Sequence, residues 1–148
     1  MSSSVQPKPQ AKVQRHFNVP AERVFSAWLD PLQIGHWMFG PTIRDEEIIS
    51  LKTSPKVGGK FSFIVNRQGK QFDHVGEYLE IQRPTRLVFT WAVTQVGGEP
   101  SKVIIDITPM EEGCELALIH EMAPEWADFV VRSEEAWSKM LAALAKTL

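Results

Sequence analysis

The chain has 148 residues, of which 43% are hydrophobic and 23% are charged, and its formal net charge is −2. This length fits one domain with its own core, and the apolar content excludes a disordered chain. The near-neutral charge, with Lys and Arg scattered along the chain, gives no basis for nucleic-acid binding. A single cysteine, Cys114, excludes an internal disulfide and a cysteine-cluster metal site.

The N-terminal segment differs in composition from the rest of the chain. Residues 1–10 are rich in Ser, Pro and Gln, which predicts a flexible tail ahead of a single domain over residues 11–148. This segment lacks the apolar core of a signal peptide, and no apolar run approaches the roughly 20 residues that a membrane span needs. We expect a cytoplasmic protein without a membrane span, either a monomer or a homodimer.

The first elements are one strand and two short helices. Alternating apolar and polar residues predict a strand over residues 11–18. Apolar residues at helical spacing then predict a helix over residues 20–29. Asp30 and Pro31 are typical of the start of a second helix, because Asp caps free N–H groups and Pro fits the first turn. This second helix is expected to end near Trp37.

The middle of the chain has a period of two. Phe61, Phe63 and Val65 show the pattern most clearly, with polar residues between them. Short turns separate similar segments, which favours an antiparallel meander over parallel units. The predicted strands cover residues 46–52, 60–66, 71–81, 87–93, 103–107 and 116–120.

After Pro124 the helical period returns and continues to the last residue. The predicted helix exceeds 20 residues, and its apolar stripe consists of Trp126, Val130, Trp137, Met140, Leu141 and Leu144. A sheet with one apolar face needs a cover, and this helix is the only predicted element large enough. We therefore predict an α+β fold: a curved antiparallel sheet of about seven strands wrapped around a long C-terminal helix, with two short helices after the first strand.

Several local segments, taken together, resemble a known family. They are residues 20–31 (PAERVFSAWLDP), 36–37, 40–41, 58–61 (GGKF), 76–81 (GEYLEI), 86–91 (RLVFTW) and 135–141 (EAWSKML). In this order they resemble the homologues of the activator of the ninety-kilodalton heat-shock-protein ATPase. That family belongs to the helix-grip (SRPBCC) superfamily of START lipid-transfer domains and birch-pollen allergens. The resemblance implies a cavity between the sheet, the long helix and the short helices. It also implies diverse roles, which include small-molecule binding, cyclase-like catalysis and stress-response co-chaperone activity.

Strand parity and the helical stripe predict which side chains line this cavity, with simple packing as the alternative for each of them. The predicted ligand-binding residues are Trp37, Phe39, Phe61, Phe63, His74, Tyr78, Phe89, Trp91, His120, Val130, Trp137, Met140 and Leu141. The strand over residues 71–81 leaves two alternatives open, because its apolar residues change phase. Either His74 and Tyr78 or Glu77 points inward, and Gly76 is a candidate bulge.

No motif in the chain predicts catalysis, a cofactor or a metal site. The acidic clusters at residues 45–47 and 111–112 are expected to be solvated. The leading hypothesis is the binding of a hydrophobic or aromatic small molecule, lipid-like or polyketide-like. One alternative is a co-chaperone-like regulator that contacts a heat-shock chaperone through exposed residues such as Arg44 and Lys52. The other is a cyclase- or hydrolase-like enzyme with His74 or Glu77 as its base.

Overall fold

The computed structural model describes residues 8–148, which form one seven-stranded antiparallel sheet of strand order β1-β7-β6-β5-β4-β3-β2. The strands are β1 (Gln10–Phe17), β2 (Glu47–Thr53), β3 (Lys60–Arg67), β4 (Lys70–Gln82), β5 (Arg86–Val93), β6 (Ser101–Pro109) and β7 (Cys114–Glu121). The helices are α1 (Ala21–Leu29), α2 (Pro31–Trp37), the 3-10 helix η1 (Pro124–Phe129) and α3 (Val130–Thr147). Most of the predicted tail lies outside the described residues, and its last residue, Gln10, begins β1.

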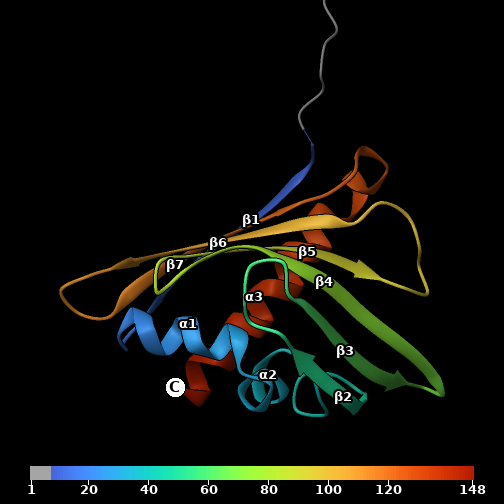
Figure 1. Cartoon of the computed structure of the whole chain (residues 1–148), viewed down its shortest axis with the longest axis horizontal. Helices are drawn as coiled ribbons and strands as arrows, with labels where there is room; N and C mark the ends of the chain where they lie inside the picture. Colours follow the sequence, from blue (N-terminus) through green and yellow to red (C-terminus); the bar gives the residue numbers. More distant parts are fainter. Residues whose placement is uncertain (1–7) are drawn as a thin grey trace, which may run out of the picture.

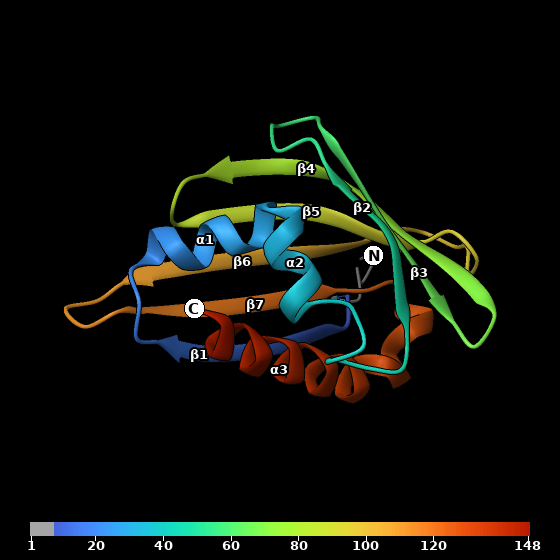
Figure 2. The same cartoon turned by 90° about the horizontal axis from the view of Figure 1, so that it is seen from below.

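The sheet curves around the helices and encloses the core on its concave side (Figure 1). Seen from below, α1 and α2 cross the concave face, whereas α3 runs along the β1 side (Figure 2). The backbone N–H of Lys12 in β1 donates to the Glu134 carboxylate in α3 at 2.9 Å, which joins the helix to this edge of the sheet. The predicted α+β helix-grip architecture is confirmed.

The C-terminal helix begins later than the sequence predicts. The α-helix starts at Val130, and the preceding residues form η1, in which the Trp126 N–H bonds to the Ala123 carbonyl at 2.9 Å. Phe129, the last residue of η1 and the N-cap of α3, has a ψ of 1°, outside the α-helical range. The prediction of one continuous helix from Pro124 is therefore wrong, and Trp126 does not share the buried stripe of α3, which consists of Trp137, Met140, Leu141 and Leu144.

Strand β4 resolves the open question of which residues face inward. His74 and Tyr78 are buried, whereas Glu77 is only half-buried and its N–H bonds to the Thr90 hydroxyl. The register against β5 shifts between Tyr78 and Glu80. A bulge here shifts the alternation of inward and outward side chains by one residue, so that Ile81 rather than Glu80 packs against the core after Tyr78.

Gly76 is not the bulge but a point of close approach. A Cβ atom at this position would lie 1.9 Å from the Thr90 carbonyl oxygen and 2.4 Å from the Phe61 ring. The absence of a side chain lets β5 and the Phe61 ring approach the β4 backbone.

Candidate functional site

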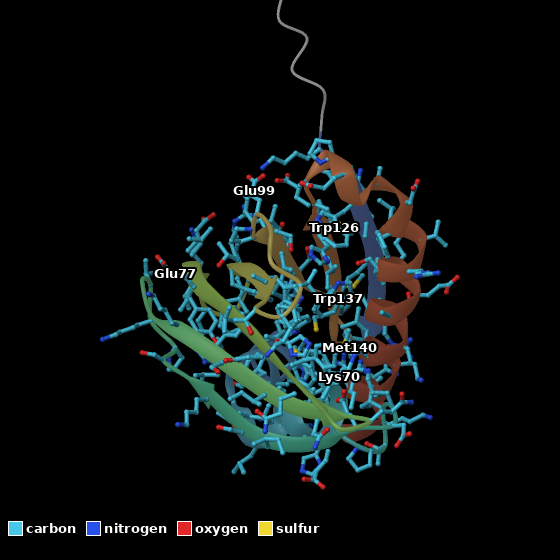
Figure 3. The ribbon with its side chains drawn as sticks, turned by 90° about the vertical axis from the view of Figure 1, so that its right-hand side faces the viewer. Lys70, Glu77, Glu99, Trp126, Trp137 and Met140 are labelled. Atoms are coloured by element: carbon cyan, nitrogen blue, oxygen red, sulfur yellow. The ribbon has the colours of Figure 1, made fainter. Side chains whose placement is uncertain are left out.

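Two of the predicted residues line one pocket together: Trp91, near the end of β5, and His120, near the end of β7. The pocket has a volume of about 240 Å³ and lies where these strand ends meet η1 and the first turn of α3. Its wall consists of Trp91, Ala92, Val93, Val96, Gly97, Glu99, Ser101, His120, Met122, Trp126, Phe129 and Ser133. Figure 3 shows Glu99 and Trp126 in the upper part of the view and Trp137, which is buried, below them.

The 3-10 helix supplies the outer apolar wall of this pocket. Pro124 starts the helix, and its tight turns bring the Trp126 and Phe129 rings to a centroid distance of 5.0 Å. Phe129 is 40% exposed and Val96, on the β5–β6 loop, is 56% exposed. Large apolar side chains that remain exposed around a concave surface are typical of a binding site.

A hydrogen-bond network around His120 forms the polar wall. Trp137 Nε1–H donates to His120 Nδ1 at 3.1 Å. Since an indole N–H only donates, Nδ1 carries no proton, and the neutral imidazole has its proton on Nε2. Nε2–H then donates to Ser101 Oγ at 2.7 Å, and the Ser101 hydroxyl donates to the Trp91 carbonyl at 3.0 Å. The network links α3, β7, β6 and β5 across the pocket.

Both inward-facing histidines are held in the neutral form. Burial lowers the pKa of His120 to about 4, because the apolar surroundings disfavour the imidazolium. Burial likewise lowers the pKa of His74 to about 4, and its Nδ1 bonds to the Phe63 carbonyl at 3.0 Å. His74 therefore donates from Nδ1, which is the opposite tautomer from His120.

Most of the other predicted residues lie in the packed interior. The buried ones are Trp37, Phe39, Phe61, Phe63, His74, Tyr78, Phe89, Trp137, Met140 and Leu141. Their rings contact one another closely, for example Phe61 and Phe63 at a centroid distance of 4.7 Å. The cavity between Phe61, Tyr78, Phe89 and Trp91 measures about 10 Å³, close to the minimum for a single water molecule. The central aromatic residues thus fill the space that the sequence assigns to a ligand.

Val130 is the one predicted residue that lies neither in the core nor in the pocket wall. It is the first residue of α3, where it is half-buried.

Burial also raises the pKa of the Tyr78 hydroxyl in the interior. His74, the candidate base of the enzyme hypothesis, contacts the Phe39 and Trp91 rings at centroid distances of 4.8 and 5.5 Å.

Several pocket residues were absent from the sequence prediction, although signals for two of them exist. Ser101 is in phase with Val103 and Ile105 along β6, so strand parity places it on the inner face. Ser133 precedes Trp137 by four residues, which puts both on one face of α3. Met122 follows the end of β7 and Phe129 ends the 3-10 helix, so neither strand parity nor α-helical spacing places them at the pocket.

The expectation that the acidic residues 45–47 are solvated is wrong for Glu46. Its side chain is fully buried and accepts hydrogen bonds from the Gly40 N–H, Arg44 and Arg67 at 2.8, 3.0 and 2.6 Å. Arg44, expected to be an exposed charge, is only partly exposed. Arg67 lies 21 residues further along the chain, so sequence spacing alone does not reveal the pairing.

Within residues 8–148, no three His, Cys, Asp or Glu side chains gather as they would around a metal ion. No helix in the same part of the chain combines the length and apolar character that a membrane crossing needs.

The curved seven-stranded sheet and the long C-terminal helix packed against it define a helix-grip domain. The family model described as "Activator of Hsp90 ATPase homolog 1-like protein" matches residues 18–148, and the chain belongs to this family. No curated protein sequence gives a significant match.

Solved structures share the fold at low sequence identity. The crystal structure of protein CV1439 from Chromobacterium violaceum has a TM-score of 0.79 and 23% identity, over 93% of this chain and 95% of that one. The AHSA1-like protein from Aeromonas hydrophila has a TM-score of 0.76 and 19% identity, over 93% of this chain and 90% of that one. CalU16 from Micromonospora echinospora has a TM-score of 0.69 and 24% identity, over 92% of this chain and 71% of that one.

Proposed function

We propose that the protein binds a compact aromatic or hydrophobic small molecule in the pocket between Trp91, His120 and η1. The observation that carries this proposal is the composition of the wall, in which aromatic and aliphatic side chains surround a small polar network. Ligand pockets generally combine an apolar lining with a few fixed polar groups. The family's fold commonly binds hydrophobic ligands, which agrees with this site.

The pocket volume limits the size of the ligand. A closed apolar cavity of about 150 Å³ binds benzene in another protein, so about 240 Å³ suits a molecule of one or two fused rings. A long lipid chain would extend beyond the wall into solvent. The volume therefore favours a compact aromatic ligand over a long lipid-like one.

Ser133 is the group best placed to orient a ligand. Its hydroxyl lies 3.4 Å from His120 Nδ1, whose lone pair already accepts from Trp137. The Ser101 hydroxyl donates to a backbone carbonyl, and the His120 Nε2–H donates to Ser101. The Ser133 hydroxyl hence retains the most freedom to bond a ligand hydroxyl or carbonyl.

A pair of variants on one helix tests the proposal. Indole and 2-naphthol are titrated into the full chain, with backbone amide NMR shifts and the unfolding temperature as readouts. At a ligand concentration of 100 times Kd, binding stabilises the native state by about 2.7 kcal/mol, which raises the unfolding temperature by roughly 5–10 °C. Ser133→Phe fills the pocket and should abolish this rise. Ser138→Phe, on the exposed face of α3, should leave it unchanged.

The proposal fails if neither compound changes the amide shifts or the unfolding temperature of the unmodified chain. It fails equally if Ser133→Phe and Ser138→Phe reduce binding to the same extent. The second result would assign the response to non-specific contact with the surface.

The family description supports a second candidate, an effect on the ATPase rate of an Hsp90-type chaperone. Such a role would depend on the surface rather than on the pocket. Lys52→Glu, at an exposed position of β2, should then reduce the stimulation, whereas Ser133→Phe should not. An unchanged ATPase rate in the presence of the chain would remove this candidate.

A further inference from the structure

A second concave surface, separate from the small-molecule pocket, has a different chemistry. It is a groove of about 370 Å³ lined by Arg44, Asp45, Arg67, Gln68, Lys70 and Phe72, and we name it the basic groove. It lies at the tip of the β3–β4 hairpin, which extends to one end of the molecule in Figure 1. In Figure 3 this tip, marked by Lys70, faces the viewer.

Two arginines of the groove lining, Arg44 and Arg67, pair with the buried Glu46 carboxylate, and this cluster has more positive than negative charge. The Glu46 carboxylate accepts from Arg44 Nη1 on one oxygen and from Arg67 Nε on the other. A buried carboxylate needs such partners, since an unpaired charge in the interior costs several kcal/mol. One carboxylate balances only one of the two guanidinium groups, so a positive charge is left over.

Both guanidinium groups keep donors directed away from Glu46. Arg67 uses only Nε in this pairing, and no hydrogen bond from its terminal nitrogens occurs among residues 8–148. Arg44 uses only Nη1, which also bonds to the Met38 carbonyl at 3.0 Å. Each guanidinium carries five N–H donors. The side chain of Arg44 is 28% exposed and that of Arg67 is 32% exposed. Unused donors of both residues are therefore open to solvent at the groove.

The two guanidinium planes are held in position by aromatic rings. Arg67 lies over the Phe72 ring with its central carbon 5.4 Å from the ring centroid, and Arg44 lies over Phe39 at 5.7 Å. Stacking and ion pairing together reduce the rotamer freedom that each side chain would lose on binding. Burial lowers the pKa of Arg44, with the neighbouring Arg67 charge acting in the same direction.

Lys70 adds a third positive charge and Asp45 a second negative one. Three positive and two negative side chains leave a net charge of +1 at the groove. Lys70 is exposed, and it makes no ion pair within the part of the chain that the structure describes. An anion that enters the groove thus meets two fixed guanidinium groups and one mobile ammonium group.

We propose that the basic groove binds the oxyanion of a small molecule, a carboxylate or a phosphate, through Arg44, Arg67 and Lys70. The planar fork of an arginine matches two oxygens of either anion, and the lysine adds a point charge. The site is independent of the Trp91–His120 pocket and shares no residue with it.

The test uses the full chain and two probes, inorganic phosphate and acetate, in NMR titrations that follow the arginine Nε–H and backbone signals. Lys70→Gln removes an exposed charge and should raise the Kd about fivefold, as expected for one charge pair near 4 Å in water. Arg67→Lys keeps the charge but loses the fork, and should raise the Kd about tenfold, as expected for the loss of one hydrogen bond to a charged group. Lys60→Gln, at the other end of β3, is the control and should leave the Kd unchanged.

Each outcome decides the proposal. Saturable shifts at Arg44, Arg67 and residues 68–72 that Lys70→Gln weakens and Lys60→Gln leaves unchanged support it, and the tighter probe identifies the anionic group. Shifts that are spread over all lysines, or equal Kd values for the wild type and Lys70→Gln, overturn it. Because Lys70 is exposed, this variant folds, and the result does not depend on the stability of Arg67→Lys.

Discussion

Trp137 in α3 donates its indole N–H to His120 Nδ1 in β7 at 3.1 Å, and this bond sets the tautomer of a buried histidine. The indole also packs near Trp28 and Trp91, each at a centroid distance of 5.8 Å. One side chain thus connects the packed interior with the wall of the small-molecule pocket. Its replacement should affect both stability and the protonation of His120.

Trp137→Phe should lower the free energy of unfolding by more than the loss of ring volume alone explains. It leaves the buried His120 Nδ1 without its main donor, which costs about 1–3 kcal/mol. Trp28→Phe is the matched control, because the buried Trp28 Nε1 has no hydrogen-bond partner. Urea unfolding should show the larger loss for Trp137→Phe. Equal losses for the two variants would contradict a stabilising role of the hydrogen bond.

Stability should fall as the pH decreases from about 6.5 to about 4. His74 and His120 have folded-state pKa values of about 4, below the ordinary 6.5, so the unfolded chain takes up protons first. Each histidine then lowers the free energy of unfolding by about 1.4 kcal/mol per pH unit in this window. The contribution is fully present above pH 6.5 and levels off below pH 4.

The comparison of His120→Gln with the wild type isolates one of the two groups. Between pH 7 and pH 5 the variant should lose about 2 kcal/mol less than the wild type in urea unfolding. Direct titration of the imidazole by NMR gives the pKa independently. A His120 pKa near 6.5 in the folded protein would rule out this account.

Glu46→Gln should destabilise the fold by about 3 kcal/mol. The substitution leaves two guanidinium groups close together without the buried carboxylate that joins them. Glu47→Gln, at the adjacent and exposed position, should change stability by less than about 0.5 kcal/mol. Thermal unfolding of both variants measures the difference, and similar values would show that Glu46 is not held as the structure describes.

Gly76→Ala should destabilise the domain by at least about 3 kcal/mol. The added methyl group would lie 1.9 Å from the Thr90 carbonyl, which belongs to a sheet strand and has little room to move. Glu77→Ala provides the control at the next, half-buried position. Circular dichroism and unfolding temperature are sufficient readouts, and a well-folded Gly76→Ala protein would refute the close approach of β4 and β5.

The sequence alone determined the order of elements and the inner face of most strands. Alternation at Phe61, Phe63 and Val65 depends only on the two-residue period of a strand, and these side chains are buried. The helical spacing of Trp137, Met140, Leu141 and Leu144 gave the covering helix in the same way. Such patterns are local, so they can be recognised without knowledge of the partners.

The tertiary structure decided the features that depend on contacts between distant residues. The bulge after Tyr78 changed which residues of β4 face inward. Arg67 pairs with the buried carboxylate of Glu46, which the sequence predicts to be solvated because its neighbours are acidic. Aromatic packing filled the centre of the fold and left the open pocket at one end, beside η1. These outcomes follow from how side-chain volumes and charges combine in three dimensions, which the period of a single segment does not encode.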